Sequence, residues 1–231
     1  MLRSLFLYGQ GVDVKELMMG LAATVFVVFC SLPVHEFAHA WTATKLGDDT
    51  PGLKGRLTLN PMAHLSLMGS LMIFLVGFGY AKPVPVNIRN FKNRKRDFAL
   101  VAAAGPASNL IMAFVFLILS DVAFVFAYHY FIAVPTMKVA ADFFFFAANI
   151  NIYLAVFNLL PIPPLDGSRI ATLILPDKYY YRLMQYERYI MIVTMLLLFT
   201  GVLSRPLSSL AGLVLRGLGT VADIPFKVFG L

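Results

Sequence analysis

Long stretches without a charged residue constrain this chain more than any other feature. Three of them are long enough, or nearly so, to cross the hydrocarbon core of a bilayer, which is about 30 Å thick and requires about 20 helical residues. They run from Leu17 to Val34, from Phe98 to Ser120 and from Phe143 to Leu165. Two shorter stretches, Tyr189 to Ser204 and Leu65 to Tyr80, are also uncharged. We therefore expect the chain to fold in lipid as a bundle of helices.

The composition agrees with a membrane protein and argues against several other classes. Hydrophobic residues make up 59% of the 231 residues, charged residues make up 13%, and the mean hydropathy is +0.78. Soluble domains are apolar over only about half of their residues. The net charge of +7 favours contact with anionic lipid over nucleic acid, because the basic residues cluster beside apolar stretches. Cys30 is the only cysteine, so neither a disulfide framework nor a thiolate metal site is available.

The positions of the basic residues predict the orientation of the chain. Five of the eight residues from Arg89 to Arg96 are basic, and three more lie between Lys45 and Arg56. The positive-inside rule therefore places both segments in the cytoplasm. The stretch Leu65 to Tyr80 between them is expected to enter and leave by the same membrane face, as a re-entrant segment. The next two crossings carry the chain outward and back, which returns Asp166 to the face of His35. Tyr189 to Ser204 is then expected to cross once more, and Leu207 to Phe229 is expected to form a weakly amphipathic tail helix.

Small extended elements are expected at the membrane surface. The sequence between Lys45 and Asn60 is punctuated by glycine and partly alternating, which predicts a β-hairpin. The segment Lys82 to Val86 alternates proline and valine, so it can form only an edge strand or an extended loop. The expected fold is an all-α membrane protein, a single domain over residues 1–231 with about four full spanning helices, a re-entrant segment and small membrane-associated β-strands.

An HExxH pattern, formed by His35, Glu36 and His39, ends the first apolar stretch. Residues four apart share one face of a helix, so both imidazoles can reach one metal ion while Glu36 lies beside it. The alternative is a pair of histidines that are simply hydrogen-bonded at a helix end. We favour the metal site, because ionisable residues in a membrane-spanning run are costly and usually serve a function.

A catalytic zinc ion needs three protein ligands and one open position for water. The third ligand must come from elsewhere in the chain, and the segment Asn158 to Gly167 is the best source. Its three prolines break the helix, and Asp166 follows that break. The alternative role for Asp166 is to act only as the N-cap of a helix expected from Ser168 to Leu175.

Together these motifs resemble the site-2 protease family of intramembrane zinc metalloproteases. The resemblance rests on the HExxH pattern and on the Asn-x-x-Pro-x-Pro-x-Leu-Asp-Gly pattern that ends at Gly167. It covers residues 30–170 and looks like the short bacterial or archaeal branch, which lacks PDZ and CBS domains. That branch often has an aspartate where this chain has Ser66. Three further motifs carry the resemblance: Gly55-Arg56-Leu57-Thr58-Leu59-Asn60-Pro61 with His64, Ala81-Lys82-Pro83-Val84-Pro85-Val86-Asn87, and Ala104-Gly105-Pro106 with Asn109.

The resemblance implies a cofactor and roles for individual residues. It implies one zinc ion per chain held by His35, His39 and Asp166, with Glu36 as the catalytic base that activates water. It also implies that Asn158 contacts the substrate backbone near the metal.

Three further polar residues are candidates for the same site, and two of them, Asn109 and His64, are expected to bind substrate together with Asn158. Asn109 lies in a long apolar run, where it either joins helices or supports the site through a hydrogen bond. His64 either stabilises an oxyanion or has a structural role. Asn151 lies seven residues before Asn158 and thus on the same helical face, which predicts that this face lines a polar cleft.

The expected function is hydrolysis of peptide bonds in or near transmembrane segments of membrane-protein substrates. The protein is expected to be integral to a bacterial or archaeal cell membrane, with its active site towards the cytoplasm and no nucleic-acid partner. One alternative is a catalytically silent membrane scaffold of the same fold, for which Glu36 would be unnecessary. Another is a transporter in which the histidines and Asp166 bind a cation in transit. The sequence does not determine the oligomeric state.

Overall fold

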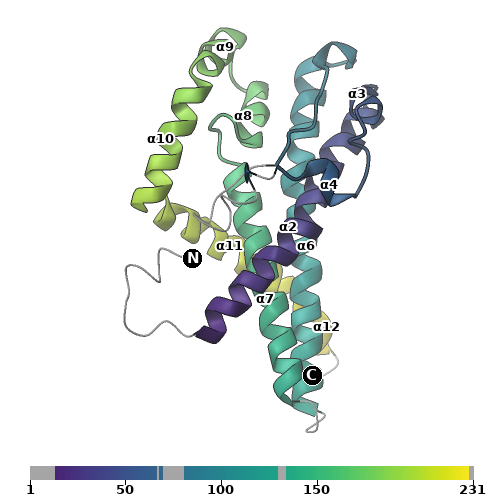
Figure 1. Cartoon of the computed structure of the whole chain (residues 1–231), viewed down its shortest axis with the longest axis vertical. Coiled ribbons are helices and arrows are strands. Elements are labelled where there is room, and N and C mark those ends of the chain that lie inside the picture. The colour runs from purple at the N-terminus through teal and green to yellow at the C-terminus, as the bar shows by residue number, and fades with distance from the viewer. Residues whose placement is uncertain (1–13, 67, 70–80, 130–133, 229–231) are drawn as a thin grey trace.

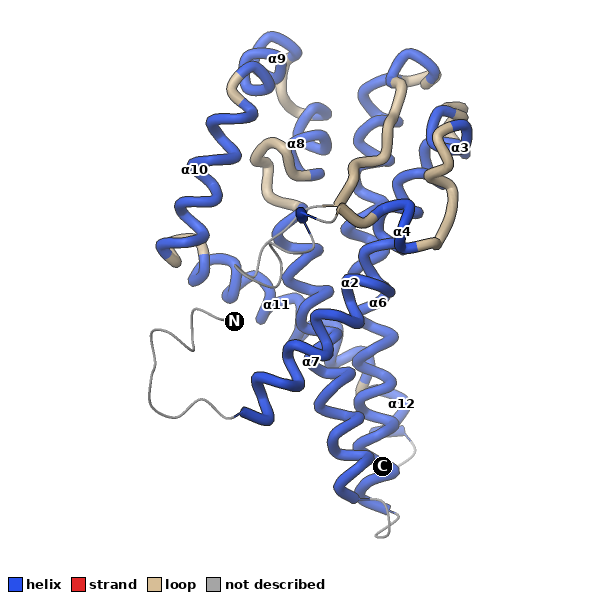
Figure 2. The backbone as a smooth tube through the Cα atoms, viewed as in Figure 1, coloured by secondary structure: helices blue, strands red, loops and turns tan. Residues whose placement is uncertain are grey.

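The computed structural model describes residues 14–66, 68–69, 81–129 and 134–228, and these are predominantly helical (Figures 1 and 2). No strand occurs in these ranges. In chain order the elements are α2 (Val14–Lys45), α3 (Thr50–Leu53), α4 (Pro61–His64), η1 (Ile88–Asn90), α6 (Arg94–His129), α7 (Val134–Asn158), α8 (Asp166–Ile170), η2 (Ala171–Leu173), α9 (Asp177–Gln185), α10 (Glu187–Thr200), α11 (Ser204–Ala222) and α12 (Ile224–Val228).

Four segments of the described chain are long and apolar enough to cross a membrane. Three of them contain most of the long uncharged stretches, which confirms the predicted helix bundle. At 1.5 Å per residue, even the shortest is about 35 Å long and therefore exceeds the hydrocarbon core. The four segments are Val14–Lys45, Arg94–Ala127, Thr136–Asn158 and Ser204–Val228.

The fourth candidate span is not the segment that the sequence predicted. The stretch Tyr189 to Ser204 was expected to cross the membrane, but α10 ends at Thr200, where Gly201 adopts a left-handed φ of 83°. Glycine adopts this conformation without steric cost, so it ends the helix in a turn. A helix with the 14 residues of α10 is only about 21 Å long. The tail, Ser204–Val228, is the fourth candidate span instead.

Helices α2, α6 and α7 pack against one another at the centre of the molecule, and α11 packs against α6 and α7 (Figure 1). Their interfaces contain fully buried alanines such as Ala113, Ala147 and Ala148. Small side chains let helix backbones approach closely, which drives helix association in lipid. Aromatic rings add to the contact: the centroid of Phe26 lies 5.5 Å from that of Phe116.

The β-hairpin predicted between Lys45 and Asn60 is wrong. Helix α2 continues to Lys45, and a turn then leads into α3, which has Pro51 in its first turn. Gly47 and Gly55 flank α3 with φ values of 102° and 67°. The proline and glycines that punctuate this segment therefore start and end short helical turns, where the prediction assigned them to a strand connection.

A buried carboxylate joins the loop after α2 to the loop before α6. Asp48 is fully buried and accepts hydrogen bonds from the Asn87 backbone N–H and from Asn90 Nδ2, both at 2.7 Å. The Thr50 backbone N–H and hydroxyl also donate to it. Burial by itself raises the pKa of the Asp48 carboxyl, but the hydrogen bonds from Thr50, Asn87 and Asn90 lower it below its usual range. The ionised form therefore fits this buried position.

The segment Lys82 to Val86 is an extended loop, one of the two forms that its sequence allows. The Lys82 backbone N–H donates to the His64 carbonyl oxygen at 2.7 Å, and the Asn87 N–H donates to Asp48 at the other end. The loop is therefore fixed at both ends. The re-entrant segment predicted for Leu65 to Tyr80 lies almost entirely outside the described residues.

Candidate metal centre

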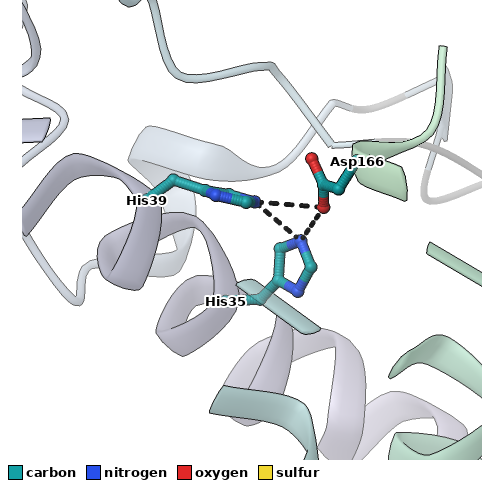
Figure 3. A group of neighbouring side chains, drawn as sticks. All are labelled: His35, His39 and Asp166. Carbon is teal, nitrogen blue, oxygen red and sulfur yellow. Dashed lines mark hydrogen bonds and ion pairs between the residues drawn. The ribbon is translucent and has the colours of Figure 1, made fainter. Parts of the chain in front are cut away.

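Two histidines lie one turn apart in the C-terminal part of α2 (Figure 3). The Nε2 atoms of His35 and His39 are 3.1 Å apart, and their ring planes meet at 85°. Each residue is only 6% exposed. Helix α2 continues through Pro33, so the spacing that the HExxH pattern predicts on one helical face is retained.

Asp166 meets this pair from a distant part of the chain. Helix α7 ends at Asn158, and the chain turns through the proline-rich segment before α8 begins at Asp166. The Asp166 Oδ2 atom is 3.3 Å from the Nε2 atom of each histidine (Figure 3). Leu165, rather than Asp166, occupies the N-cap position of α8. The carboxylate is therefore directed at the histidines from the first turn of that helix.

The three atoms form a set that fits a zinc ion. Two imidazole nitrogens and one carboxylate oxygen are common zinc ligands, and a catalytic site has three protein ligands. Ligands about 2.0–2.1 Å from a tetrahedral zinc ion lie about 3.4 Å from one another. The observed separations of 3.1 to 3.3 Å are close to this value. Within the described chain, His35, His39 and Asp166 are the group of side chains that could hold a metal ion.

Gly105 on α6 leaves room for this group. A Cβ atom at Gly105 would lie 2.6 Å from His35 Cε1 and closer still to His39 Nε2 and Cε1. Real Cβ atoms do not approach neighbours this closely. The absence of a side chain at Gly105 therefore allows α6 to pack directly against the two imidazoles.

The outer nitrogens of both imidazoles are also engaged by α6. His39 Nδ1 is 2.7 Å from the carbonyl oxygen of Val101, and His35 Nδ1 is 2.5 Å from Asn109 Oδ1. A carbonyl oxygen can only accept, so Nδ1 of His39 carries the hydrogen and Nε2 is free to bind a metal. Hydrogen bonds of this kind fix the ring orientation of histidine ligands.

The charge state of Asp166 also suits a metal ligand. Burial by itself raises the pKa of its carboxyl, but His39 and His35 beside it lower the pKa, and the net result lies well below the usual range. The side chain is therefore ionised near neutral pH. A carboxylate must be deprotonated to bind a metal ion.

Comparison with known proteins identifies the family. Residues 23–201 match the model of peptidase family M50. The chain belongs to this family. It is therefore a zinc-dependent metalloendopeptidase, and the four long apolar helical segments within its described residues make it an integral membrane protein.

The relatives of this M50 peptidase come from bacteria and an archaeon, and each is named "Putative zinc metalloprotease". YwhC of Bacillus subtilis is 42% identical over 176 residues, which cover 76% of this chain and 80% of the relative. Rip2 of Mycolicibacterium smegmatis is 34% identical over 142 residues, or 59% of this chain and 51% of the relative. MJ0611 of Methanocaldococcus jannaschii is 31% identical over 104 residues, or 45% and 49% of the two chains. No solved structure matches this chain.

Among the other predicted site residues of this M50 peptidase, Glu36 lies beside the histidines on α2, whereas Asn158 lies at the end of α7. Glu36 follows His35 directly on α2 and is 8% exposed. Asn158 is the last residue of α7, and its Nδ2 donates to the Leu154 carbonyl oxygen of the same helix at 2.9 Å. Asn109 contacts His35 directly, and substrate contact by Asn109 and Asn158 stays a prediction.

His64 lies in α4, where it is fully buried. Its Nε2 donates to the Thr58 carbonyl oxygen at 2.7 Å, and its backbone oxygen accepts from Lys82. Its Nδ1 has no hydrogen-bond partner among the described residues. Through these contacts His64 joins the loop before α4 to the extended loop that begins at Lys82. Its predicted catalytic role stays a prediction.

Glycine also determines the packing behind Asp166. A Cβ atom at Gly167 would overlap the backbone carbonyl groups of Leu159 and Leu160. Gly167 therefore lets the first turn of α8 pack against the chain that leaves α7, which positions the preceding Asp166.

The sequence interpretation missed two kinds of supporting residue. Gly105 and Gly167 were recognised only as parts of motifs, and their spatial role depends on which helix faces them. Ser31, whose hydroxyl oxygen accepts a hydrogen bond from Asn151 Nδ2 at 3.1 Å, was not considered. It lies four residues before His35 and thus on the same face of α2. That spacing is the one signal that could have identified it.

Proposed function

We propose that this peptidase hydrolyses peptide bonds in or near the transmembrane segments of other membrane proteins. The observation that carries the proposal is where the metal-ligand group lies. His35 and His39 belong to a candidate membrane span, and Asp166 follows the end of another. A substrate bond that reaches these residues must approach through or beside the bilayer.

In this proposal His35, His39 and Asp166 hold the zinc ion and Glu36 acts as the base. Zinc, when bound, polarises the scissile carbonyl and lowers the pKa of water. Glu36 accepts a proton from the attacking water and later donates it to the leaving amine. The burial of all four residues, each 8% exposed or less, limits the access of bulk water, which strengthens these electrostatic interactions. Asn158 contacts the substrate backbone.

The extended loop from Lys82 to Val86 is the proposed docking edge for the substrate. A helical substrate must unwind before its carbonyl groups can be attacked, and an unwound peptide can pair with an extended edge. Within the described ranges, the backbone groups of Val84 and Val86 make no backbone hydrogen bond. His64 holds one end of the loop and Asp48 holds the other, which supports a preorganised edge.

We also propose that the active site faces the cytoplasm of a bacterial or archaeal cell. The basic cluster Arg89 to Arg96 includes the start of α6, and the positive-inside rule favours a cytoplasmic position for such a cluster. Asp48 joins this region to the loop after α2.

The decisive test compares wild type with Glu36→Gln, both purified in detergent. Zinc stoichiometry is measured for each, and each is offered a panel of single-span membrane proteins. Both should hold one zinc ion, while only the wild type should cut, because loss of a general base typically costs a factor of about 10² to 10⁴ in rate. Glu16→Gln, an exposed position at the start of the same helix, is the matched control and should cut normally. Wild type that holds zinc but cuts nothing would favour a scaffold, and zinc flux into proteoliposomes would favour a transporter.

The docking edge has its own test. Val86→Pro removes one backbone N–H from the edge, whereas Val86→Thr retains it. We expect the proline variant to lose cleavage while zinc content is unchanged, and the threonine variant to cut. Equal cleavage by both variants would refute the pairing.

A further inference from the structure

A chain of hydrogen-bonded side chains runs from the metal centre across the helix bundle. Asn109 on α6 lies against His35, with its Oδ1 2.5 Å from His35 Nδ1. Asn109 Nδ2 donates to Asn151 Oδ1 on α7 at 3.0 Å. Asn151 Nδ2 in turn donates to the Ser31 hydroxyl on α2 at 3.1 Å and to the Ala147 carbonyl oxygen at 2.9 Å. The chain thus connects the three central helices.

These side chains are isolated from solvent. Asn109 is 1% exposed, Asn151 0% and Ser31 1%. Buried polar groups are costly unless they are hydrogen-bonded, and a span in lipid has no water to supply partners. Both the oxygen and the nitrogen of each amide have a partner here. No amide oxygen or nitrogen of these two asparagines is therefore left without a partner.

The backbone of α7 determines which atom donates and which accepts in each hydrogen bond of this network. The Ala147 carbonyl oxygen can only accept, so Asn151 must present Nδ2 to it. Asn151 Oδ1 then faces Asn109, which must donate through its own Nδ2. This orientation turns Asn109 Oδ1 towards His35. Because an amide oxygen can only accept, His35 Nδ1 must carry a hydrogen, and the lone pair of Nε2 faces His39 and Asp166.

We propose that Asn109 and Asn151 are positioning residues of the metal centre, which hold His35 in the tautomer and ring orientation that bind zinc through Nε2. The inference rests on the proposed role of His35 as a ligand. His39 receives the same support from one backbone group, the Val101 carbonyl. His35 is supported through two asparagine side chains, which relay the direction set by the Ala147 carbonyl.

Zinc affinity tests this inference without any substrate. Affinity is measured by competition with a chelator on the purified full-length protein, and thermal unfolding is recorded for each variant. Asn109→Leu should weaken zinc binding by about 10-fold to 100-fold, the usual effect of losing a partner of a histidine ligand. Asn151→Leu should weaken it less, because Asn109 can still accept from His35. Asn149→Leu is the matched control on α7, since Asn149 bonds to Phe145 of its own helix, and it should bind zinc normally.

Asn109→Asp separates positioning from simple joining of helices. A carboxylate still accepts from His35 Nδ1 but no longer donates to Asn151. Positioning predicts zinc affinity within several-fold of wild type, whereas a role only between helices predicts a loss as large as that of Asn109→Leu. A folded Asn109→Leu protein with wild-type zinc affinity would overturn the inference.

A measurement on the wild type covers the case in which Asn109→Leu does not fold. In protein labelled with ¹⁵N-histidine and loaded with zinc, NMR should show His35 with hydrogen on Nδ1 and metal on Nε2. Zinc bound through His35 Nδ1 would overturn this inference alone. Zinc bound by neither His35 nor His39 would overturn the proposed metal site and this inference with it.

Discussion

The helices around the candidate metal centre and helix α10 differ in the side chains that they bury and expose. Interfaces of α2, α6 and α7 contain fully buried alanines and buried asparagines. Most of helix α10 lies to one side of this bundle (Figures 1 and 2), with Leu198 packed against the cluster that includes Ile152 on α7. The helix exposes large apolar side chains, with Leu196 58% and Phe199 64% exposed. Lipid tails solvate such side chains well, so exposure of this kind costs little in a bilayer.

The comparison shows which interactions hold the side chains of the candidate metal centre in place. Burial of large apolar side chains gives little specificity when the solvent is itself apolar. The geometry of the candidate metal centre instead depends on close backbone approach, as at Gly105, and on directed hydrogen bonds, as at Asn109. Substitutions in the bundle should therefore have much larger effects than substitutions in α10.

The largest effect is expected for Gly105→Ala. Its Cβ would collide with both imidazoles, so we expect zinc to be lost from the purified protein, as measured by metal analysis. Gly217→Ala on α11 is the control, because a Cβ there meets nothing within 4 Å. Full zinc content in Gly105→Ala would show that α6 does not constrain the metal centre.

Gly167→Ala should have the next largest effect. The added Cβ would meet the carbonyl groups of Leu159 and Leu160, so the turn that carries Asp166 must move. Displacement of one ligand should lower zinc affinity by about tenfold or more, as measured by chelator competition. Unchanged affinity would mean that Asp166 is not held by this contact.

A smaller effect is expected for Ala147→Leu at the centre of the bundle. Overpacking a tight interface costs about 1–3 kcal/mol, which should lower the midpoint of thermal unfolding in detergent. A midpoint equal to that of wild type would contradict close packing between α6 and α7.

The smallest effect is expected for Leu196→Ala on α10. Surface substitutions usually change stability by less than about 0.5 kcal/mol, and Leu196 is 58% exposed. Thermal unfolding should therefore be almost unchanged. A loss as large as that of Ala147→Leu would remove the distinction between the two regions.

Local sequence features predicted that His35, His39 and Asp166 would lie together. The spacing of His35 and His39 places both on one helical face, and the prolines before Asp166 end α7 at the required place. The lengths of the uncharged stretches predicted three of the candidate spans. Each of these signals depends on a few adjacent residues, so it can be recognised without knowledge of the packing.

Features that depend on packing between helices could not be predicted in the same way. The sequence shows Gly105 and Asn109 on one helix, but not which neighbouring side chains they meet. The hairpin prediction between Lys45 and Asn60 failed because glycine and proline favour short helical turns and strand connections alike. The role of Asp48 arises from partners 39 and 42 residues away, and no local pattern reveals them.

Asp48 also restricts how the chain can be threaded through the bilayer. Its hydrogen bonds with Asn87 and Asn90 require the two ends of the intervening chain to lie at the same membrane depth and on the same face of the bilayer. A membrane-impermeant thiol reagent applied from a single compartment should therefore label cysteines introduced at Lys54 and Lys92 together, or label neither.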